Sequence, residues 1–394
     1  MVLLKLNYYR NGRDMTHFSY DYEYLLHLLY CFIHGEKPSE KPDNISFERV
    51  FELGKIHEVA NIAFLSVEML ENKPDDALYN EWKIYYYFSV ERDSRQEAER
   101  ERIINALHES GIRTLEAQGT VTKKYYPQRE LRMMSDIDII VDYESFKKAE
   151  AVLEKLGYEI NEQQEFEIEA ENAQKLIVEF HADFFTEFMY NRAERYSKAI
   201  NKPFEHAKPN ESDPLTFDLD DTYFYLYSLL HTIKHFEVAG CGIRRILDLY
   251  YLKKAFESKI DNDLVSRIID ENGFRPSYET LFAVERLWFE NEGSELDLTE
   301  AINDIIISGN HGAAELFTRN NIRKDRQKGV KFARINAVLH FIFQKKKYIY
   351  LSYPELEEQG RGYLYCWFYR LFKSVKRMDF SHAKNYLKTI IKSK

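Results

Sequence analysis

Two aspartates, Asp136 and Asp138, lie in the run 134–141 (MSDIDIIV), and their spacing is suited to metal-dependent phosphoryl chemistry. Side chains alternate across a β-strand, so both carboxylates would project from one face while Ile137 and Ile139 enter the core. Phosphoryl and nucleotidyl transfer uses such acids to hold two Mg²⁺ ions ~3.5–4 Å apart, which activate the attacking oxygen and neutralise the leaving pyrophosphate. An isolated Asp-x-Asp is also common at solvated strand ends. The neighbouring residues therefore have to distinguish a metal site from an ordinary strand end.

Two neighbouring motifs favour the metal site. Upstream, Gly119 and Thr120 follow the expected strand IRTLEAQG, and backbone N–H groups at a glycine before a helix can approach a phosphate closely. Downstream, Glu179 and His181 alternate with apolar residues in IVEFH and would share one strand face. A third carboxylate on an adjacent strand would complete the metal cluster.

The elements that would position these residues form an α/β layer in the middle of the chain. Expected strands are IRTLE, IDIIV, YEI and KLIVEFH. A helix is expected after Thr120, and a second one, YESFKKAEAVLEKL, would be capped by Asp142 and end at Gly157.

The flanking regions are expected to be helical. In residues 1–95, helical spacing places apolar residues on one stripe: Val50, Leu53, Ile56, Val59 and Ala60. A charged helix from Ser94 to Ser110 would end at Gly111, and the chain after Pro214 is helical and aromatic to its end. We therefore expect an N-terminal helical region (1–95), a core (96–205) and a C-terminal helical domain (206–394).

Composition describes a soluble globular protein of two or three domains, with 394 residues, 44% hydrophobic and 30% charged. The sequence contains neither a run of ~20 apolar residues nor a recognisable signal peptide, so we expect a cytoplasmic protein without a membrane segment. Cys31, Cys241 and Cys366 have no disulfide or zinc-ribbon spacing and are expected to be free thiols.

The net charge of −10 disfavours a general nucleic-acid binder, although it is spread unevenly. Residues 344–394 carry 12 Lys/Arg against 4 Asp/Glu. This segment could meet RNA or an acidic partner, but a solvated face on terminal helices is the favoured interpretation.

The ordered motifs resemble a bacterial family of uncharacterised nucleotidyltransferases within the DNA polymerase beta-like superfamily. The resemblance is carried by QGTVTKKYYPQRELRMMSDIDIIVDYESFKKAEAVLEKLGYE and VEFH, and weaker likeness extends to KIHEVANI, HTIKHFEVAGCGIRRILDLYYL and LSYPELEEQGRGYLYCWFYRLF. It implies an α+β fold, in which a polymerase beta-like core (a mixed sheet with helices on one side) is flanked by N-terminal helices and a C-terminal helical domain. It also implies an enzyme that moves an NMP group from an NTP, expected to be ATP, to an unknown acceptor.

The resemblance further implies roles for individual residues. Asp136, Asp138 and Glu179 would be the catalytic metal ligands for two Mg²⁺ ions, and Glu179 could also activate the acceptor hydroxyl. The expected nucleotide-binding residues are Gly119, Thr120, Arg132 and Lys123. The sequence departs from the family at Gln118, where lysine is more usual, and Lys123 with Lys124 could supply the missing charge.

The motif HTIKH raises other possibilities. His231 and His235 have zinc-ligand spacing, and Asp248 or Glu237 could be a third ligand, but Thr232 stands where a metalloprotease has its catalytic glutamate. The histidines could instead be packed between helices, or line the acceptor side of the cleft; the residues expected there are His181, His231, His235 and Asp248. A non-catalytic nucleotide-sensing protein is the alternative to an enzyme. The acceptor is expected to be a small molecule or a protein; a nucleic acid is possible but not favoured.

Overall fold

The computed structural model describes residues 18–164, 167–185, 193–310 and 359–377, residue 356, and a few positions between 312 and 323. Among these residues, no helix is long and apolar enough to cross a membrane. The basic segment 344–394 lies mostly outside the described residues. The three cysteines are free and buried, as the sequence predicted.

Three short helices open the described chain: α1 (Phe18–His34), α2 (Phe47–Ile56) and α3 (Ala60–Val67). The Ser46 side chain caps α2 by accepting a hydrogen bond from the Arg49 N–H. The expected apolar stripe is interrupted after α2, because Glu58 adopts a left-handed backbone with φ 55° and Ile56 is 52% exposed. Two helices therefore form where the spacing indicated one continuous face.

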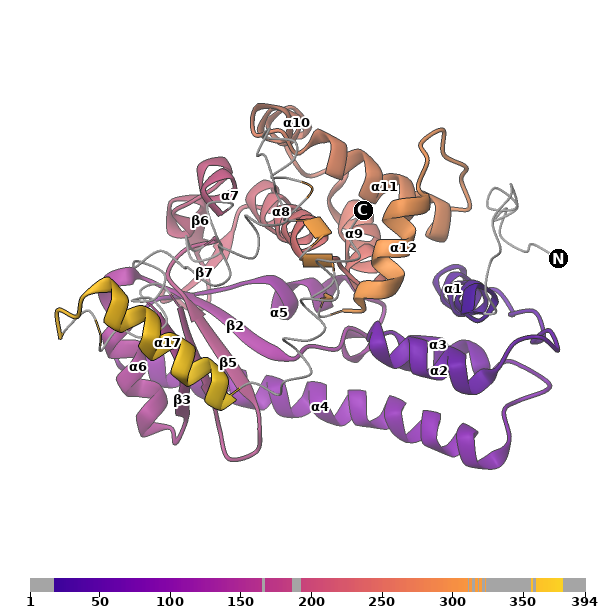
Figure 1. Ribbon diagram of the computed structural model, residues 1–394, viewed down its shortest axis with the longest axis horizontal. Helices are drawn as coiled ribbons and strands as arrows, with labels where there is room; N and C mark the ends of the chain where they lie inside the picture. Colours follow the sequence, from indigo (N-terminus) through magenta and orange to yellow (C-terminus); the bar gives the residue numbers. More distant parts are fainter. Residues whose placement is uncertain are drawn as a thin grey trace.

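A single long helix, α4 (Asp76–Glu109), connects these helices with the sheet (Figure 1). The Asp75 carboxylate caps its first turn, and Gly111, with φ +69°, follows its end. The helix expected at Ser94–Ser110 is the second half of α4, so the boundary predicted at residue 95 falls inside one unbroken helix.

A seven-stranded mixed sheet with the order β3-β4-β5-β2-β1-β7-β6 forms the centre of the fold. The pairs β2–β5 and β1–β7 are parallel and the other neighbours are antiparallel. The strands are β1 (Thr114–Glu116), β2 (Asp136–Val141), β3 (Glu159–Gln164), β4 (Glu167–Glu171), β5 (Ile177–His181), β6 (Ala207–Pro209) and β7 (Thr216–Leu219). The sequence did not predict β4, β6 or β7.

The two faces of the sheet differ in what covers them. One face packs against α4 and α6 (Phe146–Lys155) through a cluster that includes Ile137, Ile139, Val178 and Phe180. The opposite face carries the acids of β2 and β5, and its apolar residues join the core shared with the C-terminal helices. The expected α+β architecture, with a mixed sheet between helical regions, is confirmed.

The expected cap at Asp142 is wrong. Asp142 precedes the 3₁₀ turn η4 (Tyr143–Ser145), but its side chain does not cap that turn. The carboxylate instead accepts two hydrogen bonds from the Arg113 guanidinium, one from Nε and one from Nη2. This ion pair joins the start of β1 to the end of β2.

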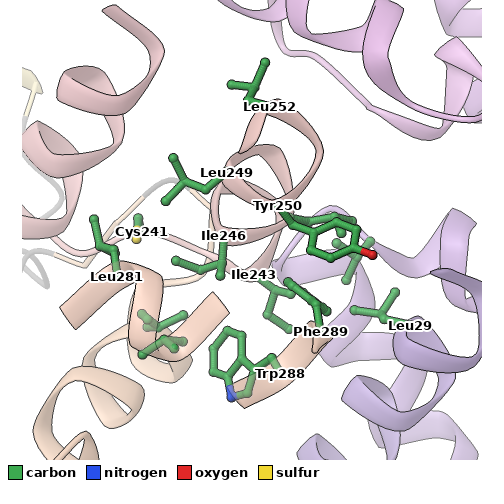
Figure 2. Close-up of a cluster of buried hydrophobic side chains, with 14 of the residues drawn as sticks. Leu29, Cys241, Ile243, Ile246, Leu249, Tyr250, Leu252, Leu281, Trp288 and Phe289 are labelled. Atoms are coloured by element: carbon green, nitrogen blue, oxygen red, sulfur yellow. The ribbon is translucent and has the colours of Figure 1, made fainter. Parts of the chain in front are cut away.

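The C-terminal region is helical, with α7 (Ala193–Ala199), α8 (Asp221–Val238), α9 (Ile243–Phe256), α10 (Asn262–Glu271), α11 (Arg275–Phe289), α12 (Thr299–Ser308) and α17 (Tyr363–Arg377). Figure 2 shows the core around α9, which includes Ile246 and Leu249 of α9 and Trp288 and Phe289 of α11. Leu29 of α1 joins the same cluster. The N-terminal and C-terminal helices therefore share one hydrophobic core.

The expected division into regions 1–95, 96–205 and 206–394 remains a prediction. Between residue 206 and α8, the chain first adds β6 and β7 to the sheet, with β7 pairing in parallel with β1. The expected helical stretch after Pro214 begins only at Asp221 for this reason.

Candidate active site

The parallel pairing of β2 with β5 brings the acids together. Asp138 is the direct partner of Glu179, and Ile140 is the partner of His181. Asp136 lies on the same face as Asp138 because side chains alternate along the strand. Three carboxylates from two neighbouring strands therefore point to the side of the sheet that faces the C-terminal helices.

The His181 imidazole lies between these carboxylates. Its Nε2 is 3.1 Å from Asp138 Oδ1 and 3.4 Å from Glu179 Oε2, and its Nδ1 is 4.0 Å from Glu167 Oε2. Burial lowers the pKa of His181, but hydrogen bonds to Asp138 and Glu179 outweigh it and raise the pKa to about 10. A protonated imidazole thus supplies positive charge between the acids.

The carboxylates also influence one another. Burial, followed by the charge of Glu179, raises the pKa of Asp136, while a hydrogen bond from Ser135 opposes the rise. Burial and the charge of Asp136 raise the pKa of Asp138, against the effect of His181. Burial is thus the larger cause of both raised pKa values, and repulsion between the carboxylates adds to it; a bound cation would relieve that repulsion.

Within the described residues, one group has metal-ligand geometry: Asp138, Glu179 and His181, whose ligand atoms lie within 4.8 Å of one another. Asp136 is beside this group without belonging to it. The carboxylate oxygens of Asp136, Asp138 and Glu179 are the donor type that Mg²⁺ prefers, so the residues present fit the implied ion.

The segment around Gly119 and Thr120 lies in the short helix α5 (Gln118–Thr122). Both residues are buried, and the Thr120 hydroxyl has no hydrogen-bond partner among the described residues. A Cβ on Gly119 would lie 2.7 Å from both Arg132 Nη1 and Met134 Sδ. Protein packing alone therefore requires glycine here, whether or not a phosphate approaches it.

Gln118 begins α5 with an unusual left-handed backbone, at φ 44°. Its side-chain Nε2 donates a hydrogen bond of 2.7 Å to the Tyr227 hydroxyl on α8. The residue that departs from the family pattern thus connects the sheet with α8.

Arg132, a predicted nucleotide-binding residue, already has a partner within the protein. Its guanidinium makes two hydrogen bonds of 2.9 Å to the Asp248 carboxylate, and both residues are buried. The Tyr126 hydroxyl donates a third bond, of 2.7 Å, to Asp248. Asp248, predicted to lie on the acceptor side, is therefore engaged in a buried ion pair.

Lys123 and Lys124 are also unsuited to replace a lysine at position 118. Lys123 is only 2% exposed and forms an ion pair of 2.5 Å with Asp93 on α4. Lys124 is exposed and lies 3.4 Å from Glu116. The predicted contact between Lys123 and the nucleotide would require breaking a buried ion pair.

His231 and His235 stack on one face of α8, with ring centroids 4.5 Å apart and Nε2 atoms 2.5 Å apart. Burial lowers the pKa of His231 well below its usual value, and the charges of Lys234 and His235 add to this. The suggested third zinc ligands are engaged elsewhere, because Glu237 bonds to Arg195, Tyr196 and Ser277, and Asp248 bonds to Arg132. The metal-capable group contains neither histidine of HTIKH.

The sequence assigned no site role to two cations, Lys234 and Arg245, which lie in the segment HTIKHFEVAGCGIRRILDLYYL. Lys234 follows His231 by three positions and therefore lies near the same face of α8. Arg245 is in the first turn of α9, directly after Arg244. Two features of the sequence could have identified them: a lysine inside the motif HTIKH, and a pair of arginines where the next helix begins.

The comparison with protein families agrees with this geometry. A model of a family described as "Uncharacterised nucleotidyltransferase" matches residues 43–290, which include the sheet, the acids, α8 and α9. The chain belongs to the uncharacterised nucleotidyltransferase family. The resemblance inferred from the motifs is thereby confirmed, and members of such a family act on a nucleotide and an acceptor. No curated protein matches the chain.

One solved structure is similar in part, the solution structure of the antibiotic-resistance factor ANT(2'')-Ia. The match covers 48% of this chain and 96% of that chain, at 15% sequence identity and a TM-score of 0.35. A likeness at this level says nothing about the substrate of this chain.

Proposed function

We propose that this protein transfers a nucleoside monophosphate group from an NTP, expected to be ATP, to an acceptor. The acceptor oxygen would form a bond to the α-phosphorus, the bond from that phosphorus to the β-phosphate oxygen would break, and pyrophosphate would leave. The observation that carries the proposal is the placement of Asp138 directly beside Glu179, with Asp136 on the same sheet face. Family membership supports nucleotidyl transfer in general.

The side chains divide the work of the proposed reaction. Asp136, Asp138 and Glu179 would hold two Mg²⁺ ions, which when bound neutralise developing charge on the phosphates. Glu179 would also take the proton of the acceptor hydroxyl. Gly119 and Thr120 remain the proposed phosphate-contacting backbone and hydroxyl, and the Thr120 hydroxyl, unpartnered within the described residues, suits that role.

The acceptor side is proposed to lie towards α8, with His181 of β5 and the stacked His231 and His235. The His231 ring centroid is 6.1 Å from that of Tyr227, whose hydroxyl accepts the hydrogen bond from Gln118 at the start of α5. A small molecule or a protein side chain is the proposed acceptor, because the acidic chain would repel a long nucleic acid.

The test is product analysis after incubation of the protein with labelled NTPs, Mg²⁺ and a cell metabolite extract. Pyrophosphate release together with a labelled adduct in the mass spectrum supports the transferase. Asp142→Asn is the matched control for Asp138→Asn, because Asp142 follows the same strand but pairs with Arg113 away from the acids. Mg²⁺-dependent NTP binding without pyrophosphate release in any extract would favour the nucleotide-sensing alternative.

A further inference from the structure

Two basic side chains at the candidate active site lack an anionic partner. Within the described residues, neither Lys234 of α8 nor Arg245 of α9 forms a side-chain hydrogen bond or an ion pair, and Arg245 Nε is buried without a partner. The nearest recorded contact of the Lys234 ammonium is the Phe185 ring, whose centroid is 5.5 Å away. Both residues are half-buried, so their charges are neither fully hydrated nor neutralised.

The neighbouring cations behave differently. Arg132 is paired with Asp248, Arg244 lies 2.6 Å from Glu58, and Lys123 is paired with Asp93. A cation that holds a fold together is expected to contact a carboxylate in this way, because burial without a partner is costly. Among the described residues, Arg92 donates to the carbonyls of Met134 and Ser135, whereas Lys234 and Arg245 contact neither a carboxylate nor a carbonyl.

Contacts with the segments next to β2 and β5 place the two cations near the acids. Arg244, the residue before Arg245, donates a hydrogen bond to the Met133 carbonyl, three residues before Asp136. The Lys234 ammonium lies over the ring of Phe185, four residues after His181. Burial and the charge of Arg245 lower the pKa of Lys234 to about 8, while Glu167, Asp138 and Glu179 act in the opposite direction. Burial and the charge of Arg244 lower the pKa of Arg245 to about 10. Arg245 also acts on the pKa of Asp136. Two like charges thus repel each other beside the acids, and a shared anion would relieve that repulsion.

We propose that Lys234 and Arg245 bind the polyphosphate part of the nucleotide, close to Asp136, Asp138 and Glu179. An arginine guanidinium offers a planar pair of donors to phosphate oxygens, and a lysine ammonium offers a compact charge. These two residues take the role that the sequence assigned to Arg132 and Lys123. The inference rests on the proposed function for the identity of the ligand.

Binding of inorganic tripolyphosphate in the presence of Mg²⁺ tests the inference without requiring turnover. Calorimetry should give a dissociation constant that rises on the order of 10- to 100-fold in Lys234→Gln and in Arg245→Gln, as expected for loss of one charged hydrogen bond. Arg245→Lys should retain part of the affinity, because it keeps the charge but loses the planar donor pair. Lys254→Gln, at an exposed position on the same helix α9, should bind like wild type.

The outcomes separate the inference from the proposed function. If tripolyphosphate binding falls in both glutamine variants but wild type releases no pyrophosphate from NTPs, the anion site stands and the transferase proposal fails. If wild type releases pyrophosphate while both variants bind tripolyphosphate like wild type, the inference is overturned and the transferase proposal stands. Failure of wild type to bind tripolyphosphate also overturns the inference. Thermal unfolding of each variant checks that the fold is intact.

Discussion

Arg132, in the loop before β2, forms a buried two-pronged ion pair with Asp248 on α9, through two hydrogen bonds of 2.9 Å. The residues are 116 positions apart, and the pair joins the catalytic sheet to the C-terminal helices. Gly119 packs against the same guanidinium, so the pair also shapes the start of α5. The relative position of the acids and the α8–α9 cations depends on this link.

Removal of one partner should therefore destabilise the protein strongly. Asp248→Asn leaves the Arg132 charge buried without its counter-ion, which typically costs about 3–5 kcal/mol of unfolding free energy. The double variant Arg132→Met/Asp248→Leu should recover much of the loss, because it leaves no uncompensated charge. Urea denaturation of the single and double variants gives the coupling energy.

Arg113→Gln provides the comparison for that experiment. Arg113 is 41% exposed in its pair with Asp142, so its loss should cost only about 0–1 kcal/mol. Equal losses at the buried and exposed pairs would show that the Arg132–Asp248 link is not a special support of the fold. Weaker nucleotide binding by folded Arg132→Met would restore the predicted nucleotide role of Arg132.

Gly119→Ala should lower stability by about 1–3 kcal/mol, the usual range for overpacking. The added Cβ would lie 2.7 Å from Arg132 Nη1 and Met134 Sδ, and the guanidinium cannot move without straining its bonds to Asp248. Gly293→Ala is the control, because nothing lies within 4 Å of its Cβ position. Thermal unfolding compares the two, and an unchanged melting temperature in Gly119→Ala would contradict the packing argument.

Gln118→Lys should raise affinity for ATP modestly, since it adds a charge next to the proposed phosphate site. The lysine ammonium can still donate to the Tyr227 hydroxyl, which Gln118 Nε2 now contacts at 2.7 Å. Gln118→Glu, of similar size and opposite charge, should weaken binding. Calorimetry that shows equal or weaker ATP binding in the lysine variant would remove position 118 from the nucleotide site.

The sequence was most informative about residues whose position depends on the alternation of side chains within one strand. Alternation in DIDIIV places Asp136 and Asp138 on one strand face, and alternation in IVEFH does the same for Glu179 and His181. The apolar residues between them identify the buried side. The spatial neighbour of Asp138 could not be read in this way, because it depends on the register between strands that lie some 40 residues apart.

The sequence was less informative about pairing between distant segments. Arg132 looked like a free cation because its partner, Asp248, lies on a helix far along the chain. β6 and β7 were missed because strands of three or four residues carry little periodicity. The break after Ile56 was missed because no glycine or proline marks it, and Glu58 takes the left-handed backbone instead.

Glu285 on α11 should make the stability of the protein pH-dependent. It is fully buried, and burial raises its pKa from 4.5 to about 7, although Lys253, 3.4 Å away, opposes the rise and Glu290 adds to it. Because the folded-state pKa is the higher one, the contribution of Glu285 to stability is greatest below about pH 4.5 and falls as pH rises through 7, by about 3 kcal/mol.

Glu285→Gln should therefore stabilise the protein more at pH 8 than at pH 5. The glutamine is never ionised, and Lys253 keeps its other partner, Glu290, at 3.1 Å. Urea denaturation at both pH values measures the difference, with the exposed Glu295→Gln as a control that should show little change. A gain in Glu285→Gln that is the same at both values would mean that this carboxyl does not titrate between them.

Asp138→Asn tests the metal site, and it should remove both turnover and the response to divalent cations. An asparagine lacks the charge to hold Mg²⁺ beside Glu179, and loss of metal-based charge neutralisation should lower the rate on the order of 10³-fold or more. Stability without metal should change little, because the variant relieves repulsion from Asp136 but weakens the interaction with His181.

Wild type should show a Mg²⁺- and ATP-dependent rise in melting temperature that EDTA abolishes, and Asp138→Asn should show none. Asp142→Asn, which leaves the acids intact, should keep the rise. A wild-type thermal shift and wild-type pyrophosphate release in Asp138→Asn would show that the acids of β2 and β5 are not the metal site.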